Sequence, residues 1–187
     1  AAILYGVLTG LNKGAFYNCS GLTSIAIPDS VISIEILAFY GCSGIIQIEN
    51  GVQYVDKWVI DCDTSVNYVT LRENTVGIAA SAFSSCSRLI SITIPDGLIS
   101  IGDSAFDGCS SLTSITIPDS LTSIGSYAFE DCSGLTRVIF ENPNGWCRTS
   151  SSAATGGTSV SSSDIADPSI AATYLKSTYA EYYWKRG

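Results

Sequence analysis

The chain has 187 residues, a net charge of −8 at pH 7 and no histidine. Its acidic balance argues against nucleic acid and anionic membranes as partners, because both attract clustered lysine and arginine. The lack of histidine removes the commonest general base and the commonest metal ligand. No apolar run reaches about 18 residues, so we expect no segment to insert into a membrane.

Residues 87–132 contain two near-copies of a 23-residue sequence, SRLISITIPDGLISIGDSAFDGC and SSLTSITIPDSLTSIGSYAFEDC. Self-similarity at such a period is typical of a solenoid, in which each unit buries its apolar face against its neighbours. Extending the alignment to both sides predicts one elongated array of about six coils over residues 1–140. Residues 1–19 fit the second half of a coil, so we expect the first coil to be incomplete.

An Ala-Phe pair followed by a cysteine marks each coil, and the pairs are separated by 23, 44, 23 and 23 residues. The wide gap predicts one degenerate, hairpin-like coil at about residues 45–65, in which Trp58, Val59 and Cys62 take the marker positions. We expect the phenylalanines to be large buried spacers between coils. The complete markers are Ala15, Phe16 and Cys19; Ala38, Phe39 and Cys42; Ala82, Phe83 and Cys86; Ala105, Phe106 and Cys109; and Ala128, Phe129 and Cys132.

Within a coil, the pattern L-x-S-I-x-I-P alternates with a period of two, as a half-buried strand does. Isoleucines such as Ile92 and Ile94 are expected to face inward, and Ser91 and Thr93 to face outward. The following Pro-Asp predicts a turn, because proline cannot donate to a strand ladder. A second short extended piece follows, and a glycine then leads into one helical or 3₁₀ turn that carries the Ala-Phe pair.

The period is lost after residue 140. Residues 141–166 begin with a turn and continue as a Ser/Thr/Gly-rich stretch, which predicts a connection. Asp167 and Pro168 form a helix start signal, and we predict a capping helix over residues 167–187. The aromatic residues of this tail could instead form a carbohydrate platform, but closing the end of a solenoid requires the same apolar surface. The apolar stripe of the helix is Ala171, Leu175, Tyr179 and Tyr182.

Seven cysteines are present, and six fall at or near the same position of successive coils. Stacked coils hold such side chains parallel at about 4.8 Å, whereas a disulfide requires β-carbons that converge to about 3.8 Å. We therefore predict free, buried thiols that act as small hydrophobic residues, with Cys147 outside the column and most accessible. The spacing matches no zinc pattern, so we predict no metal and no other cofactor.

Neighbouring carboxylates such as Asp61 with Asp63, and Glu130 with Asp131, could act as an acid and a base. At turn positions such pairs are far more often solvated or capping groups. The many serines lack a histidine partner that would activate them as nucleophiles. We therefore predict no catalytic residue.

The outward positions of the first strands form the candidate ligand-binding surface. Side by side they make a hydroxyl-rich sheet with Tyr68 near its middle and Arg137 at one side, and both residue types are enriched in binding hot spots. The alternative is that short Ser/Thr rows only keep a sheet face soluble. The candidate residues are Gln47, Glu49, Tyr68, Thr70, Ser91, Thr93, Ser114, Thr116 and Arg137.

The repeat LxSIxIPDSLxSIGxxAFxxC closely resembles the BspA type, also called the Treponema pallidum type, of bacterial surface leucine-rich repeat. The resemblance covers residues 4–140 and weakens where Arg72-Glu73-Asn74 replaces Pro-Asp-Ser. It implies a right-handed leucine-rich-repeat solenoid, built mostly of short parallel strands.

The same resemblance implies a non-enzymatic binding or adhesion module on the bacterial cell surface. Its partner is expected to be a host matrix protein, a glycan or another cell. A structural spacer that projects another domain, without a ligand of its own, is the alternative. We expect any export signal to lie outside this sequence, since no cationic segment precedes an apolar one.

Overall fold

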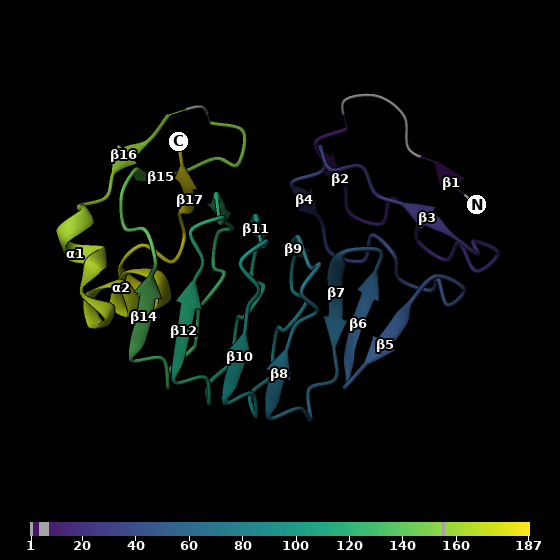
Figure 1. Ribbon diagram of the computed structural model, residues 1–187, viewed down its shortest axis with the longest axis horizontal. Coiled ribbons are helices and arrows are strands. Elements are labelled where there is room, and N and C mark those ends of the chain that lie inside the picture. Colours follow the sequence, from purple (N-terminus) through teal and green to yellow (C-terminus); the bar gives the residue numbers. More distant parts are fainter. Residues whose placement is uncertain (1, 4–7, 155) are drawn as a thin grey trace.

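The computed structural model describes residues 2–3, 8–154 and 156–187 (Figure 1). It confirms the predicted solenoid of about six coils. Each coil other than the hairpin-like one, here called an ordinary coil, contributes a first strand, a second strand and a tight turn. The first strands are β3 (Ile25–Ala26), β5 (Gln47–Glu49), β8 (Tyr68–Thr70), β10 (Ser91–Thr93), β12 (Ser114–Ile117) and β14 (Arg137–Phe140). The second strands are β2 (Gly10–Leu11), β4 (Ser33–Ile34), β9 (Gly77–Ile78), β11 (Ser100–Ile101) and β13 (Ser123–Ile124).

Ordinary coils pair in parallel with an offset of one repeat. Among the first strands, Tyr68 lies opposite Ser91, and β12 pairs with β14 in the same way; β1 (Ala2–Ile3) pairs with β3. Among the second strands, Ser100 lies between Gly77 and Ser123. Because the offset equals the repeat, equivalent side chains stack in columns along the array.

The tight turns that carry the Ala-Phe pair are not helical, which corrects the predicted helical or 3₁₀ turn. Each contains two left-handed residues, such as Ser104 at φ 51° and Gly108 at φ 72°, and these interrupt any helical run. We call these stretches turn segments. They comprise residues 13–18, 36–41, 80–85, 103–108 and 126–131.

Successive N–H groups of a turn segment alternate between two kinds of partner. The N–H of Asp107 donates to the carbonyl of Ser104 in its own turn, with an N···O distance of 3.1 Å. The N–H of Phe106 donates to Ala128 of the next coil at 2.8 Å, as Phe83 does to Ala105. Each turn segment therefore presents N–H groups to the coil that follows it and carbonyl groups to the coil that precedes it.

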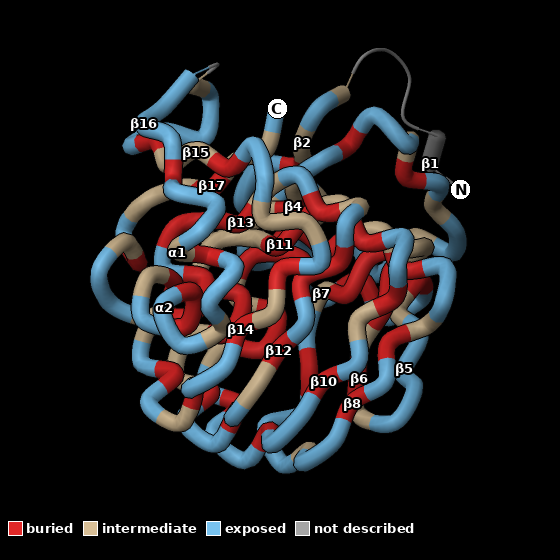
Figure 2. Tube along the Cα trace, turned by 60° about the vertical axis from the view of Figure 1, so that its left-hand side comes forward, coloured by how far each residue is buried: buried red, intermediate tan, exposed pale blue. Residues whose placement is uncertain are grey.

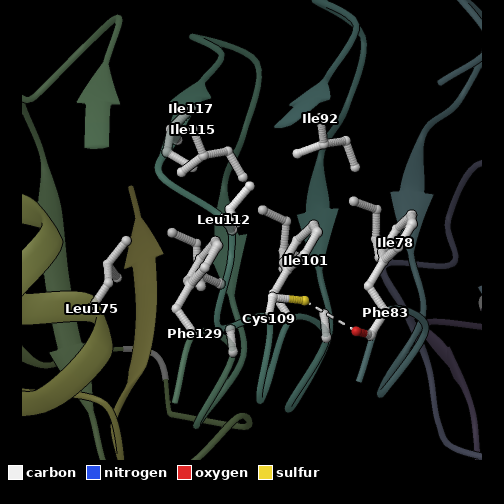
Figure 3. Packing of buried hydrophobic residues seen from close by; sticks show 14 of the residues in the cluster. Ile78, Phe83, Ile92, Ile101, Cys109, Leu112, Ile115, Ile117, Phe129 and Leu175 are labelled. Carbon is white, nitrogen blue, oxygen red and sulfur yellow. Dashed lines mark hydrogen bonds between the residues drawn. The ribbon is translucent and has the colours of Figure 1, made fainter. Parts of the chain in front are cut away.

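The phenylalanines of the last three Ala-Phe pairs form a column inside the solenoid, and Figure 3 labels the two at its ends, Phe83 and Phe129. Phe83 stacks on Phe106, and Phe106 on Phe129, with ring centroids 5.1 Å apart in each pair. All three side chains are fully buried. The thiol of Cys109 donates to the carbonyl of Phe83 in the preceding coil, with an S···O distance of 3.1 Å.

All seven cysteines are free, as predicted. Hydrogen bonding with Cys132 and burial both raise the pKa of Cys109, which keeps it in the unreactive thiol form. We predicted that Cys147 would be the most accessible cysteine. This is wrong, because Cys19 of the first coil is exposed whereas Cys147 is half-buried. The buried thiols are Cys42, Cys62, Cys86, Cys109 and Cys132.

The degenerate coil is an antiparallel hairpin. β5 pairs with β6 (Val52–Val55), β6 pairs with β7 (Trp58–Cys62), and β7 then pairs in parallel with β9. Val59 lies opposite Ile78, which is a second-strand position, so the predicted placement of Trp58 and Val59 at the Ala-Phe markers is wrong. Cys62 does join the apolar cluster that contains Cys86, and its thiol donates to the carbonyl of Asp63, with an S···O distance of 3.6 Å. In this coil, Val59 at the second-strand position and Cys62 both lie in β7, so no turn segment separates them.

The hairpin divides the interior into two apolar clusters. The N-terminal cluster contains Phe39, with Phe16 stacked on it at 5.4 Å, and Trp58. The C-terminal cluster contains the column of Phe83, Phe106 and Phe129 and extends into the cap. Figure 2 shows buried segments lining the inside of the spiral and exposed segments along its outer turns.

The C-terminal cap mixes helices and strands. α1 (Ser162–Ala166), α2 (Pro168–Thr173) and a π-helical turn, η1 (Tyr174–Thr178), pack on the last coil, and the carboxylate of Asp167 caps α2 as predicted. The helical part is shorter than expected, because the chain ends in β17 (Tyr183–Arg186), which pairs with β13 and with β15 (Trp146–Thr149). The predicted connection over residues 141–166 therefore contains β15, β16 (Thr158–Ser159) and α1.

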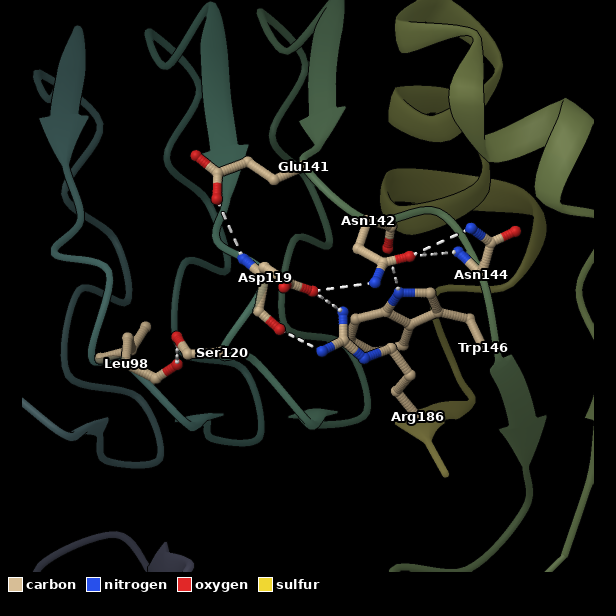
Figure 4. A network of polar contacts seen from close by, with 8 residues as sticks. All are labelled: Leu98, Asp119, Ser120, Glu141, Asn142, Asn144, Trp146 and Arg186. Atoms are coloured by element: carbon tan, nitrogen blue, oxygen red, sulfur yellow. Dashed lines mark hydrogen bonds and ion pairs between the residues drawn. The ribbon is translucent and has the colours of Figure 1, made fainter.

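A polar network joins the cap to the array (Figure 4). Arg186 of β17 forms an ion pair with Asp119, with an N···O distance of 3.0 Å. The amide of Asn142 donates to the same carboxylate at 2.9 Å, and the indole N–H of Trp146 donates to the Asn142 carbonyl. Hydrogen bonds from Asn142 and Arg186 hold the pKa of Asp119 below its usual range.

Candidate binding surface

The predicted site residues lie on the outward side of the first strands. Eight of the nine are exposed, and Ser114 is half-buried. The register places Tyr68 opposite Ser91 and Ser114 opposite Arg137, so these four residues occupy equivalent positions of successive coils. Thr70, Thr93 and Thr116 form a second row. We call this the outward face.

Two large side chains on the outward face, Tyr68 and Ile48, are highly exposed to solvent. Tyr68 is 68% exposed above the buried Val69, and Ile48 of β5 is 70% exposed. The strand pattern expects Ile48 to face inward between Gln47 and Glu49, but all three residues of β5 are exposed. The reason is that β5 pairs with β6 of the hairpin instead of with a first strand.

Arg72 organises the polar groups at the hairpin end of the face. Its Nε donates to Glu49 at 2.8 Å, and its Nη1 donates to Gln47 at 2.9 Å. The guanidinium also lies 4.1 Å from the ring centroid of the buried Tyr54, in cation–π contact. Sequence reasoning did not select Arg72, although the replacement of Pro-Asp-Ser at residues 72–74 was a signal for it.

The outward face is broad and open to solvent. Tyr68 and Arg137 are separated by three strand spacings, or about 14 Å, across a row of serine hydroxyls. Such a face offers hydrogen bonds, one aromatic surface and one cation to a ligand. It is a sheet surface and not an enclosed pocket, so it does not exclude water as a catalytic site does.

One of the two candidate acid–base pairs, Asp61 with Asp63, makes local hydrogen bonds. Asp61 accepts the N–H of Cys62 at 2.8 Å, and Asp63 accepts the N–H of Ser65 at 2.8 Å. Such bonds stabilise turns. Within residues 2–3, 8–154 and 156–187, no cluster of His, Cys, Asp or Glu is arranged to hold a metal ion. The described helices are all too short or too polar to span a bilayer.

A groove of about 380 Å³ lies on the second strands, a face to which the sequence assigned no ligand role. Ser123 donates to Ser100 at 3.2 Å within it. At its edge, Tyr183 of the cap donates to Asp103 at 3.0 Å. These bonds tie neighbouring coils and the cap together.

Comparison with known families identifies the repeat. The family model described as the BspA type leucine rich repeat region matches the chain in six copies, over residues 9–136 and 60–170. Among curated proteins, no relative matches the chain.

Several solved structures are similar to the chain. A leucine-rich repeat protein from Eubacterium ventriosum is 28% identical, with a TM-score of 0.51, and the match covers 74% of this chain and 41% of that protein. A leucine rich cell surface protein from Faecalibacterium prausnitzii is 30% identical, with a TM-score of 0.46, over 74% and 38% of the two chains. The T. pallidum leucine rich repeat protein is 31% identical, with a TM-score of 0.39, over 71% and 52%.

The chain thus spans about half or less of the length of these solved relatives. The family match, in contrast, extends over most of the chain and over every coil with an Ala-Phe marker except part of the first. The repeat spacing, the parallel register and the phenylalanine column agree with it. The chain belongs to the BspA-type leucine-rich repeat family.

Proposed function

We propose that the chain is a non-enzymatic, extracellular binding module of a bacterial surface protein. Its ligand is a protein on a host or neighbouring cell, held against the outward face. The observation that carries this proposal is Tyr68, an aromatic side chain 68% exposed in an otherwise hydroxyl-rich sheet. The extracellular location rests on membership of the BspA-type family.

The composition and shape of the face favour a protein ligand. Tyrosine and arginine contribute most of the binding energy in many protein interfaces, and here Tyr68 and Arg137 are both exposed. Arg72 holds Gln47 and Glu49 in place, which lowers the conformational entropy that binding would cost. A small glycan is bound best by a concave site, whereas a flat sheet suits the broad surface of a protein.

The test begins with an array of matrix proteins and glycans probed with the purified chain. For the ligand found, Tyr68→Ala is expected to weaken binding by about tenfold or more, and Arg137→Ala by less. Tyr127→Ala is the matched control, because this tyrosine is also exposed but lies on a turn segment.

Two outcomes would contradict the proposal. Equal binding by the Tyr68 variant and the wild type would place the ligand on another surface. Failure of the wild-type chain to bind any member of the array would favour the alternative of a spacer that carries another domain.

A further inference from the structure

A pocket of about 430 Å³ opens where the hairpin replaces a turn segment. Residues 34–41 of the preceding coil form one wall, and residues 79–81 of the following coil form the other. Ile46 and the hairpin residues Gln53, Ile60 and Asp61 complete the lining. We call this pocket the notch. It exists because the chain passes from Val59 to Cys62 without a turn segment, which leaves the two neighbouring turn segments without the coil that would separate them.

One wall of the notch carries unpaired backbone N–H groups. In the other inner coils, alternate N–H groups of a turn segment donate to the next coil, as Ser81 does to Asp103 at 2.9 Å. The equivalent groups of the wall are the N–H groups of Leu37, Phe39 and Gly41. These three have no backbone partner in the part of the chain that the structure describes.

The coil on the opposite side of the notch carries the complementary groups, and Ala80 is the one of them that lines it. The carbonyls of Ala80, Ala82 and Ser84 occupy the positions that accept N–H groups from a preceding coil, as Ala105 accepts from Phe83. Among the described residues, none donates a backbone N–H to them. The two coils are hydrogen-bonded directly where the N–H of Ala80 donates to the carbonyl of Ile34 at 2.9 Å. This bond closes one end of the notch.

Unpaired backbone groups in a half-buried site favour the addition of an extended chain. Phe39, Ala80 and Ala82 are buried, and buried backbone groups are almost always hydrogen-bonded. An extended peptide can offer carbonyl groups to the N–H groups of one wall and N–H groups to the carbonyls of the other, as in peptide recognition by strand addition.

The lining of the notch specifies the side chains of that peptide. Ile36, Leu37 and Tyr40 are exposed large apolar residues beside it. Two carboxylates, Glu35 and Asp61, also line it, and none of its described lining residues is a lysine or an arginine. Burial and the nearby Asp103 raise the pKa of Glu35, and burial raises that of Asp61, so a cation placed beside them would be stabilising.

We propose that the notch binds an extended segment of a partner polypeptide, with one apolar or aromatic side chain in the pocket and a lysine or arginine facing Glu35 and Asp61. Carbonyl groups of the segment accept from the N–H groups of Leu37, Phe39 and Gly41, and its N–H groups donate to the other wall, at the carbonyl of Ala80. This site is separate from the outward face, and its existence does not depend on the function proposed for that face.

The probe is the peptide acetyl-KVFVK-amide, titrated calorimetrically into the full chain. We expect a dissociation constant below about 1 mM and slower amide hydrogen exchange at Leu37, Phe39 and Gly41. Acetyl-EVFVE-amide, which reverses the charge, is expected to bind at least about tenfold more weakly. The same weakening is expected for acetyl-KVFVK-amide with alternate backbone nitrogens methylated, because methylation removes the donors.

The double variant Glu35→Gln with Asp61→Asn is expected to weaken binding of acetyl-KVFVK-amide by about tenfold or more and to leave binding of acetyl-QVFVQ-amide unchanged. Asp107→Asn, a carboxylate on another turn segment, is the matched control and should change neither. The proposal is overturned if acetyl-KVFVK-amide shows no binding at about 1 mM. It is also overturned if the N-methylated peptide binds equally well, or if exchange slows only outside residues 34–41.

Discussion

The two ends of the array carry the same Phe-Cys marker in different environments. At the C-terminal end, Phe129 and Cys132 are fully buried, because Leu175 and Trp184 of the cap belong to the same apolar cluster. At the N-terminal end, Phe16 is half-buried and Cys19 is exposed, because only the second coil packs against them among the described residues. Equal sequences thus differ in burial according to their neighbours, so the contribution of a coil to stability depends on the interfaces that it makes.

The largest expected effect tests this dependence directly. Phe106→Ala removes a fully buried ring from the middle of the column and is expected to lower the free energy of unfolding by about 3 to 5 kcal/mol. Phe16→Ala removes the equivalent ring at the open end and should cost well under half as much. Urea denaturation followed by circular dichroism measures both, and equal losses would refute the dependence on neighbours.

A second substitution addresses the junction between the two clusters. A β-carbon at Gly77 would overlap the ring of Trp58, which is fully buried. Gly77→Ala is therefore expected to lower the free energy of unfolding by about 1 to 3 kcal/mol. Gly21→Ala is the control, since a β-carbon there meets no atom within 4 Å. If both variants unfold at the same urea concentration, the hairpin is not tightly packed against β9.

A third change is expected to stabilise the C-terminal coils. Thr75 occupies the inward position that Leu98 and Leu121 hold in later coils, and within the described chain its buried hydroxyl has no hydrogen-bond partner. Thr75→Val removes this hydroxyl at nearly constant volume, for a gain of about 1 to 2 kcal/mol. The control Thr149→Val should be destabilising, because that buried hydroxyl donates to Ser151 at 2.7 Å. A loss of stability in Thr75→Val would show that its hydroxyl is satisfied.

The smallest effect concerns the cap, where Asp119 is largely exposed and therefore screened by solvent. Its pKa is lowered by Asn142 and Arg186, so its ionised form stabilises the folded state above the unfolded pKa of about 3.9. This contribution is lost as the pH falls through the lower folded value. Melting temperatures of the wild type and Asp119→Asn should therefore differ at pH 7 and converge in acid. A difference that persists at the lowest pH would contradict the linkage.

The sequence predicted the parts of the fold that depend on repetition. Identical local sequences adopt the same path, so a spacing of 23 residues was enough to predict the parallel register and the column of Phe83, Phe106 and Phe129. It could not predict β17, because that strand pairs antiparallel with β13, about sixty residues away, and belongs to no repeat. The left-handed residues of the turn segments were also missed, since most of them are not glycine.

For the candidate site, alternation along a strand correctly placed Tyr68 and Arg137 in solvent. The contacts of Arg72 with Gln47 and Glu49 join neighbouring coils across the hairpin, and no pattern within one repeat encodes them. The notch was missed for a similar reason. It arises from a turn segment that the hairpin lacks, and a deletion of this kind becomes a feature only when the flanking coils are seen together in space.

The alternating hydrogen bonds of the turn segments give the array a polarity. Every ordinary coil offers amide donors toward its C-terminal neighbour and carbonyl acceptors toward its N-terminal neighbour. A duplicated coil would therefore fit at any junction between ordinary coils, provided that it keeps the same chain direction. Lengthening by tandem duplication of the gene segment preserves that direction automatically, whereas an inverted unit would set donor against donor.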